Sequence, residues 1–217
     1  ISDDGRFIAG VEYHHAHLAV TVRSAVTGEL KDRPFVSGGI LDASVSPMYR
    51  ICSFSPTTDS IIVAAQYVSE DKLIICSGGE REYLPFEMDL IRDPIWSHCG
   101  RYIGFSGMKY GQLNIYVWDI MEQKLSQISD DILGEKDLSW NDDKIMCAVE
   151  SSRGETRIIE YTLDGIPRTV FADSSEIRYP ISVPDGILFL SDMNGYPDLY
   201  LLQDSTDDVV RLTALYR

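Results

Sequence analysis

The densest group of possible metal ligands in this chain is the histidine cluster His14-His15-Ala16-His17. His15 and His17 are two residues apart, so on a strand they would face the same way, and two imidazoles at that spacing can share a zinc or copper ion. A protein zinc site needs three or four ligands, and Glu12 is the one further ligand type close by in sequence. The cluster therefore favours a solvent-exposed hairpin turn over a metal site.

A second candidate is the segment from Asp192 to Asp198, which places oxygen-bearing side chains at alternate positions in the manner of a calcium loop. It lacks the bidentate glutamate that completes an EF-hand. Asn194-Gly195 between two apolar segments is instead a strong signal for a tight hairpin. We therefore expect a hairpin here.

No motif for a catalytic nucleophile or a phosphate loop is present. A hydrolase elbow reads Gly-x-Ser-x-Gly between a strand and a helix. The nearest match, Gly104 to Met108, places its second glycine one position early and lies in a β pattern. Gly78-Gly79 lacks the lysine and the helix of a phosphate-binding loop. We expect no catalytic, metal-ligating or cofactor-binding residue in this segment and no bound cofactor; whether the parent protein is an enzyme stays open.

A repeat that occurs five times must position whatever site the chain has. Each copy opens with a polar turn, in which glycine supplies positive φ and Asp or Asn bonds its own backbone. The turns are Ser2-Asp3-Asp4-Gly5, Ser55-Pro56-Thr57-Thr58-Asp59, Ser97-His98-Cys99-Gly100, Asn141-Asp142-Asp143 and Val183-Pro184-Asp185-Gly186. Such a period of about forty residues is typical of propeller blades.

Apolar segments between the turns predict the strands. The runs directly after each turn are almost continuously apolar, as in strands buried on both faces. They are Phe7–Tyr13, Ile61–Tyr67, Tyr102–Ser106, Lys144–Val149 and Ile187–Ser191. The next strands are His17–Ser24, Lys72–Cys76, Leu113–Ile120, Thr156–Leu163 and Leu199–Gln203. Closing strands include Glu82–Phe86, Leu125–Ser129, Arg168–Ala172 and Val209–Thr213.

A short strand before each turn, such as Ile95-Trp96 or Leu138-Ser139-Trp140, completes four antiparallel strands per unit. The prediction is therefore an all-β propeller with about five blades, closed by itself or part of a six- to eight-bladed ring. The blades are approximately residues 1–38, 39–90, 91–130, 131–173 and 174–217, in one propeller domain or segment. Trp96, Trp118 and Trp140 are expected in the blade cores, since Trp96 and Trp140 repeat one position.

One region departs from this regular pattern. The stretch between Phe35 and Ile51 adds about a dozen residues to the usual repeat, which predicts a long connection on one rim or an extra pair of strands. Helix should be scarce, with at most one helical turn each at Asp89–Ile91 and Asp130–Gly134. Both ends of the chain fall within a repeat, so we expect a piece of a longer protein.

Composition excludes several classes of partner. The formal net charge is −15, which argues against binding nucleic acid or an anionic membrane surface. We expect no signal peptide, and these residues contain no apolar run near transmembrane length. None of the four cysteines, Cys52, Cys76, Cys99 and Cys147, has the spacing of a zinc knuckle or redox motif. A reducing compartment fits this usage, so we expect a cytoplasmic protein.

The repeat resembles that of TolB-like (PD40, WD40-like) propellers. The matching residues are Pro94-Ile95-Trp96-Ser97, Gly100-Arg101-Tyr102-Ile103-Gly104-Phe105, Asn114-Ile115-Tyr116-Val117, Pro184-Asp185-Gly186 and Arg211-Leu212-Thr213. The same repeat builds the amino-terminal propeller of prolyl oligopeptidase (S9) serine peptidases, the tricorn-type proteases and TolB itself. Residues 186–200 look most like a blade of the peptidase-associated propellers.

That resemblance implies the propeller of an oligopeptidase-type serine peptidase, a hydrolase. Its role would be substrate gating: the ring admits peptides to a catalytic α/β-hydrolase domain outside this segment. The alternative is a non-enzymatic TolB-like propeller for protein binding, and a glycan- or ion-binding propeller is a third possibility. The expected partner is accordingly a peptide substrate or a protein, with no nucleic acid and no membrane.

Overall fold

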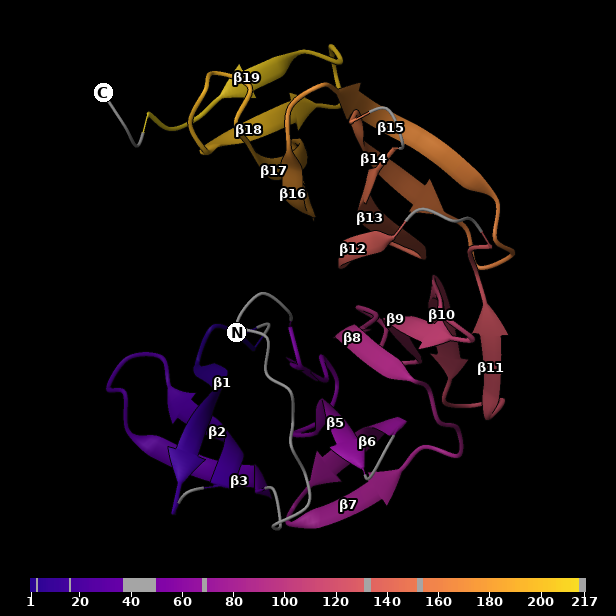
Figure 1. Ribbon diagram of the computed structural model, residues 1–217. Coiled ribbons are helices and arrows are strands. Elements are labelled where there is room, and N and C mark those ends of the chain that lie inside the picture. The colour runs from indigo at the N-terminus through magenta and orange to yellow at the C-terminus, as the bar shows by residue number, and fades with distance from the viewer. Residues whose placement is uncertain are drawn as a thin grey trace. The chain divides into compact units, whose positions relative to one another are not determined.

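All regular elements in the described residues are β-strands, arranged in five antiparallel sheets (Figure 1). The computed structural model describes residues 1–2, 4–15, 17–36, 50–67, 70–130, 134–151 and 154–214. The chain forms two compact units, the first made of residues 1–112 and 116–125, the second of 113–115 and 126–217. The longer connection expected between Phe35 and Ile51 lies mostly outside the described residues.

Two sheets lie wholly in the first unit. The first sheet has three strands in the order β1-β2-β3, namely β1 (Phe7–His14), β2 (His17–Ser24) and β3 (Leu30–Val36). The second has four strands in chain order, β4 (Cys52–Phe54), β5 (Ile61–Tyr67), β6 (Glu70–Ser77) and β7 (Glu80–Tyr83). Every neighbouring pair is antiparallel, so each sheet is a meander built from hairpins.

The remaining sheets each have four strands. The third contains β8 (Leu90–Trp96), β9 (Tyr102–Lys109), β10 (Gln112–Asp119) and β11 (Lys124–Gln127). The fourth contains β12 (Glu135–Asn141), β13 (Lys144–Glu150), β14 (Thr156–Tyr161) and β15 (Pro167–Asp173). The fifth contains β16 (Ile177–Val183), β17 (Gly186–Ser191), β18 (Asp198–Gln203) and β19 (Val209–Arg211).

The predicted all-β architecture and its strand-turn repeat are confirmed. Strands β2 and β5 have the bounds that the apolar runs predict. The strand before the third leading turn is longer than expected, because it begins at Leu90. No helical turn forms at Asp89–Ile91, where at most one was expected: Leu90 and Ile91 pair with Met108 and Gly107 on β9. The other suggested turn, at 130–134, falls largely on residues outside the described ranges.

A bulge recurs in the first strand of the third, fourth and fifth sheets. Asp93, Asp137 and Tyr179 have φ values of 50°, 57° and 52°, and the strand register shifts beside each of them. Left-handed backbone costs a non-glycine residue about 1–2 kcal/mol. At Asp93 the cost is offset by bonding to the segment before β4: its N–H donates to the Arg50 carbonyl at 2.9 Å, and its carboxylate accepts the Arg50 N–H at 3.0 Å.

Aromatic side chains fill the cores between strands, as predicted for the tryptophans. In the first unit Phe105 stacks between Phe86 and Tyr116, with ring centroids 5.5 and 5.7 Å away. Trp118 belongs to the same cluster and Trp96 packs against it. In the second unit Phe189 lies against Phe171 and Tyr200 within a separate cluster. Trp140 is also buried.

A buried carboxylate in the first unit should make stability depend on pH. Asp71 is 7% exposed, and its Oδ2 accepts the Ile91 N–H at 2.7 Å. Burial raises the pKa of Asp71, and the hydrogen bond from Ile91 offsets part of that rise. The folded state thus holds the proton more tightly than the unfolded chain does. The contribution of this proton to the stability of the fold is complete below the unfolded pKa of about 3.9. It is lost as pH rises through the raised folded pKa of Asp71.

We therefore expect Asp71→Asn to gain stability relative to the parent protein as pH rises from about 4 to about 7, because the amide stays neutral. Urea unfolding midpoints across that range measure the effect. Asp164→Asn, at an exposed residue in the turn between β14 and β15, is the matched control. An unchanged difference between Asp71→Asn and the parent across the range would contradict the assignment.

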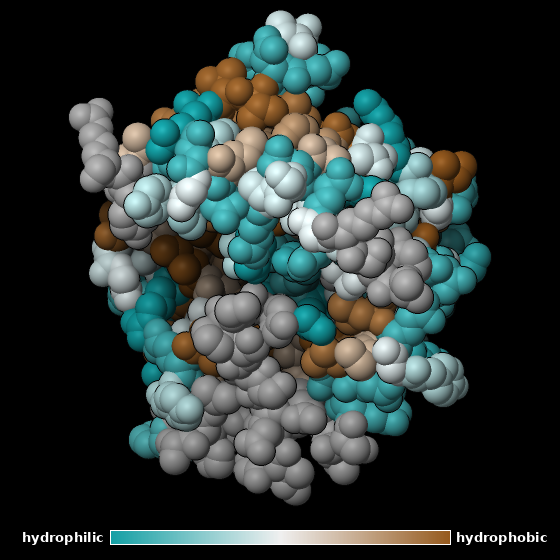
Figure 2. All heavy atoms as spheres, turned by 45° about the horizontal axis from the view of Figure 1, so that its top comes forward, coloured by the Kyte–Doolittle hydropathy of each residue, from teal (hydrophilic) through white to brown (hydrophobic). Residues whose placement is uncertain are grey.

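The surface mixes polar and apolar residues. Figure 2 shows hydrophilic residues over much of one face, with hydrophobic residues in smaller separate groups. Exposed large side chains include Tyr13, Tyr110 and Met121, which are 81%, 92% and 75% exposed. Within the described part of the chain, no helix of the length and apolarity needed to cross a membrane occurs.

Candidate ligand-binding site

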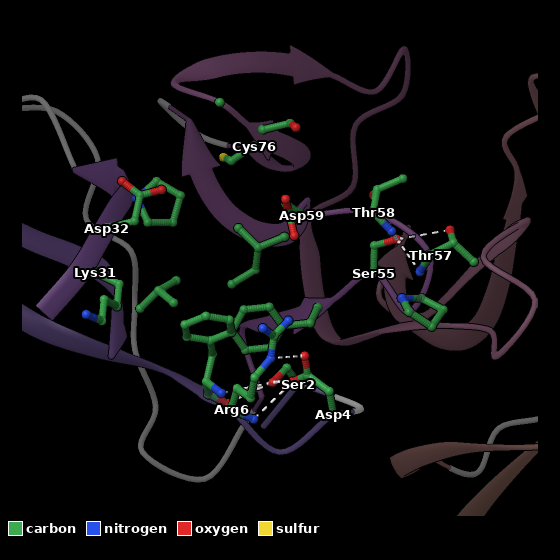
Figure 3. A pocket seen from close by; sticks show the side chains of 18 of the residues that line it. Ser2, Asp4, Arg6, Lys31, Asp32, Ser55, Thr57, Thr58, Asp59 and Cys76 are labelled. Atoms are coloured by element: carbon green, nitrogen blue, oxygen red, sulfur yellow. Dashed lines mark hydrogen bonds and ion pairs between the residues drawn. The ribbon is translucent and has the colours of Figure 1, made fainter. Parts of the chain in front are cut away.

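A cavity of about 600 Å³ lies between the first two sheets of the first unit (Figure 3). It is lined by the turn before β1, the turn before β5, strand β3 and the β6–β7 turn. The lining residues are Ser2, Asp4, Arg6, Phe7, Val22, Lys31, Asp32, Pro34, Phe54, Ser55, Pro56, Thr57, Thr58, Asp59, Ile61, Cys76, Ser77, Gly78 and Gly79. Ligand pockets commonly have volumes of about 300–1,000 Å³, so this cavity is large enough for an organic ligand.

Apolar side chains form part of its wall. Ile61 is 3% exposed and sits in the core cluster of the first two sheets, against which Val22 and Phe54 pack. Phe7, Val22 and Phe54 are half-buried, which leaves part of each side chain accessible. Phe7 lies two residues after one leading turn and Phe54 directly precedes the next, so the segments around the two turns bring two aromatic residues to the cavity lining.

The turn before β1 is held by its own polar side chains. The Ser2 hydroxyl donates to Asp4 Oδ1 at 2.7 Å and accepts the Phe7 N–H at 3.0 Å. Asp4 also accepts the Arg6 N–H at 3.0 Å and forms an ion pair with the Arg6 guanidinium. The Arg6 N–H, the Ser2 hydroxyl and the Arg6 side chain together lower the pKa of Asp4 to about 2. Asp4 and Arg6 therefore neutralise each other at the cavity edge.

The turn before β5 is also held by a serine hydroxyl that accepts backbone N–H groups. The Ser55 hydroxyl accepts the N–H groups of Thr57 and Thr58, both at 3.3 Å. The Ser55 N–H donates to the Ser60 carbonyl at 2.9 Å, which closes the turn. Figure 3 shows Ser55, Thr57 and Thr58 together on one side of the cavity and Asp59 nearer its middle. Asp59 is exposed and forms no ion pair with any described residue.

On the other side, strand β3 contributes one cation and one carboxylate. Lys31 Nζ pairs with Glu29 Oε2 at 2.8 Å. Asp32 Oδ1 accepts the neighbouring Arg33 N–H at 2.7 Å, and Asp32 has no ion-pair partner among the described residues. Burial raises the pKa of the Cys76 thiol to about 11, and the nearby charge of Asp32 also acts to raise it. The charge of Arg81 acts in the opposite direction and lowers it.

The cysteines should differ strongly in reactivity. Hydrogen bonds from the Ser97 hydroxyl, 3.3 Å from Sγ, and from the Arg101 backbone lower the pKa of the exposed Cys99 thiol. Burial raises the pKa of Cys52 and of Cys76 to about 11 in each case. Because the thiolate is the reactive form, we expect iodoacetamide at about pH 7 to modify Cys99 first.

Peptide mapping by mass spectrometry after brief alkylation of the folded protein measures this order. Cys99→Ser should remove the fast phase and leave Cys52 and Cys76 slow. Equal labelling of Cys52 or Cys76 in the folded protein would contradict the expectation. After unfolding in denaturant, the thiols of Cys52, Cys76 and Cys99 should react at similar rates, because burial and the turn are both lost.

The histidine cluster lies in the hairpin between β1 and β2, as predicted. His14 and His17 are register partners at its end, and His15 is exposed in the turn with φ of 47°. The side chains of His14 and His17 fall outside what the structure describes. Among the described residues, no group of three or more His, Cys, Asp or Glu side chains is placed to hold a metal ion.

The segment from Asp192 to Asp198 is a hairpin, as predicted. Strands β17 and β18 pair through Ser191 and Asp198, and Gly195 has φ of 83° in the turn. Asp198 is fully buried, and its carboxylate binds Arg211 and the Thr213 hydroxyl. Its oxygens are thus used to attach β19 to β18.

The serine of the incomplete elbow motif does not lie at a site. Ser106 is 1% exposed in the middle of β9, on a strand with no helix after it. The residues named in the search for nucleophiles are thus not brought together, whereas the cavity assembles residues that the sequence presents only as turns. The one signal that could have indicated it is the pair of aromatic residues flanking equivalent turns, Phe7 and Phe54.

The five antiparallel sheets match those of solved β-propeller structures. The β-propeller domain of the Trilobed protease from Pyrococcus furiosus matches with a TM-score of 0.71 and 15% identity, over 99% of this chain and 67% of that chain. TolB from Acinetobacter baumannii matches with a TM-score of 0.74 and 14% identity, over 98% of this chain and 52% of that chain. A puromycin-hydrolyzing peptidase from Mycobacterium tuberculosis matches with a TM-score of 0.75 and 12% identity, over all of this chain and 37% of that chain.

These matches confirm the predicted likeness to TolB and to peptidase propellers at the level of the fold. The chain spans about half the length of the TolB structure and about a third of the peptidase. No protein-family model matches the chain, and none of the curated proteins matches it in sequence. Because a fold hosts many functions, the similarity leaves the role to be argued from the site.

Proposed function

We propose that this chain is the propeller part of an oligopeptidase-type serine peptidase and limits which peptides reach a catalytic hydrolase domain elsewhere in the parent protein. The observation that carries the proposal is the match of the whole chain to one third of a peptidase. A propeller that is only part of such a chain leaves the remaining length for a catalytic domain. The role of the propeller is then steric selection, which needs a rigid β framework and no nucleophile of its own.

The test uses the full-length parent protein and an active-site fluorophosphonate probe. We expect one labelled serine, outside residues 1–217, together with hydrolysis of short peptide p-nitroanilides and no cleavage of folded proteins. Ser106 should stay unlabelled because it is buried in β9. The absence of any labelled serine in the parent protein, or a labelled serine within residues 1–217, would overturn the proposal.

A second candidate is a non-enzymatic propeller that binds a protein partner, as the alternative resemblance implies. The match to TolB supports this candidate about as well as the match to the peptidase supports the first, since the two TM-scores are 0.74 and 0.75. The same probe experiment separates the two candidates: an inert parent protein supports the binding role. We also propose a cytoplasmic location. All four cysteines are free in the structure, which is compatible with a reducing compartment.

A further inference from the structure

The charges around the cavity of the first unit are not balanced. Arg6 is paired with Asp4, and Lys31 is paired with Glu29. Asp32 and Asp59 line the same cavity and have no ion-pair partner among the described residues. A ligand that enters would therefore meet two unpaired carboxylates and no unpaired cation. Charge complementarity favours a cationic ligand and disfavours an anionic one.

The aromatic residues in the lining favour a guanidinium over an ammonium group as that cation. The chain's own Arg6 guanidinium lies over the Phe7 ring, 5.4 Å from the centroid, so this ring already accepts a planar cation. Phe54 offers a second half-buried ring in the same cavity. A guanidinium both stacks on aromatic faces and bonds carboxylates, whereas an ammonium group is a compact, strongly hydrated point charge.

The size of the cavity suits an organic group better than a simple ion. A volume of about 600 Å³ holds a side chain with part of its backbone. The lining combines apolar surface from Val22, Phe54 and Pro34 with the hydroxyls of the Ser55 turn. The stem of a long side chain can cover the apolar surface while its charged end reaches the carboxylates.

We propose that this cavity binds an arginine side chain of a peptide. The guanidinium is held by the carboxylates of Asp32 and Asp59, and the aliphatic stem lies against Phe54 and Val22. Figure 3 draws Asp32 and Asp59 from two different segments, β3 and the turn before β5. Binding would therefore link the first two sheets through one ligand. The proposal does not depend on the peptidase assignment, because an arginine site serves a substrate or a protein partner equally.

The test compares two capped tripeptides, Ac-Gly-Arg-Gly-NH₂ and its citrulline counterpart, which has nearly the same shape and no charge. Binding is measured by calorimetry or by NMR shifts of the protein. We expect the arginine peptide to bind about five- to tenfold more tightly, since two partly exposed ion pairs contribute modestly. The preference should weaken at about 0.5 M salt because the carboxylates are exposed.

Substitutions of Asp32 and Asp59 test whether the two carboxylates cause the preference for the arginine peptide. Asp32→Asn and Asp59→Asn should each reduce the affinity for the arginine peptide about two- to fourfold, and the double variant should bind both peptides equally. Asp164→Asn, an exposed aspartate that does not line the cavity, is the control and should leave binding unchanged. Melting temperatures of all variants verify that they fold.

Three results would overturn the proposal: equal affinity for the arginine and citrulline peptides, no binding of either peptide at about 10 mM, or retention of the preference in the double variant. Tighter binding of Ac-Gly-Glu-Gly-NH₂ would show an anion site instead and would also overturn it. Failure here leaves the peptidase proposal standing, because that proposal depends on serine labelling in the parent protein.

Discussion

Replacing Gly186 with alanine should destabilise the protein by about 3 kcal/mol or more. Gly186 begins β17 with φ of 144°, a conformation that residues with a side chain rarely adopt. An added Cβ would lie 1.9 Å from the Leu202 carbonyl oxygen and 3.0 Å from its carbon. Both atoms belong to the backbone of the adjacent strand β18, so relief requires the strands to separate. The backbone strain and the steric clash therefore add.

Gly195→Ala is the matched control in the same sheet. Gly195 has φ of 83°, and an added Cβ there has no atom within 4 Å. It should cost only the backbone term, about 1–2 kcal/mol. Urea unfolding of the three proteins, with soluble yield as a second readout, measures the difference. A Gly186→Ala variant as stable as Gly195→Ala would show that the close approach to Leu202 does not exist in solution.

The second large effect is expected at Asp137, whose removal should cost about 3 kcal/mol. The Asp137 side chain is 3% exposed and forms an ion pair with Arg178 at 2.6 Å. Its carboxylate also accepts the Tyr179 N–H at 3.3 Å, which ties β12 to β16. Asp137 holds the pKa of the Arg178 guanidinium above its ordinary value. The arginine also stays charged without this carboxylate, because the ordinary pKa of a guanidinium lies far above neutral pH. Asp137→Ala therefore leaves a partly buried cation without its main partner.

The comparison is Glu155→Ala, which breaks the pair between Glu155 and Arg157, both 40% exposed. That loss should be below about 1 kcal/mol, because water screens an exposed pair. Adding Arg178→Met to Asp137→Ala should restore part of the stability, since it removes the uncompensated charge. Denaturant unfolding of the four proteins provides the measurement. Equal costs for Asp137→Ala and Glu155→Ala would refute the importance of burial at this pair.

The parts of the fold that the sequence predicted correctly depend on patterns within a few neighbouring residues. The bounds of β2 and β5 follow from apolar runs between polar turns, because strand alternation and turn chemistry act over a few residues. The hairpin at Asn194-Gly195 follows from the backbone preference of that dipeptide. The strand at Leu90 and Ile91, where the sequence allowed one helical turn, has a non-local contact: the Ile91 N–H donates to the Asp71 carboxylate, 20 residues earlier.

The candidate site could not be predicted in the same way. Phe7, Asp32 and Asp59 come from three separate segments, and each reads in the sequence as a strand or turn residue. Only the packing of β1–β3 beside β4–β7 brings them around one cavity. The sequence also does not predict the ion pair between Asp137 and Arg178, because its partners are 41 positions apart and meet through bulges in two different sheets.

The sequence by itself determined the all-β class, the repeat of turns and strands, and the absence of a recognised nucleophile motif. Those properties depend on short-range backbone preferences and on burial patterns along single strands. Tertiary structure decided which carboxylates are paired, which glycine lies against a neighbouring backbone and where a cavity remains. Those properties depend on distances between segments far apart in the chain, which no local pattern specifies.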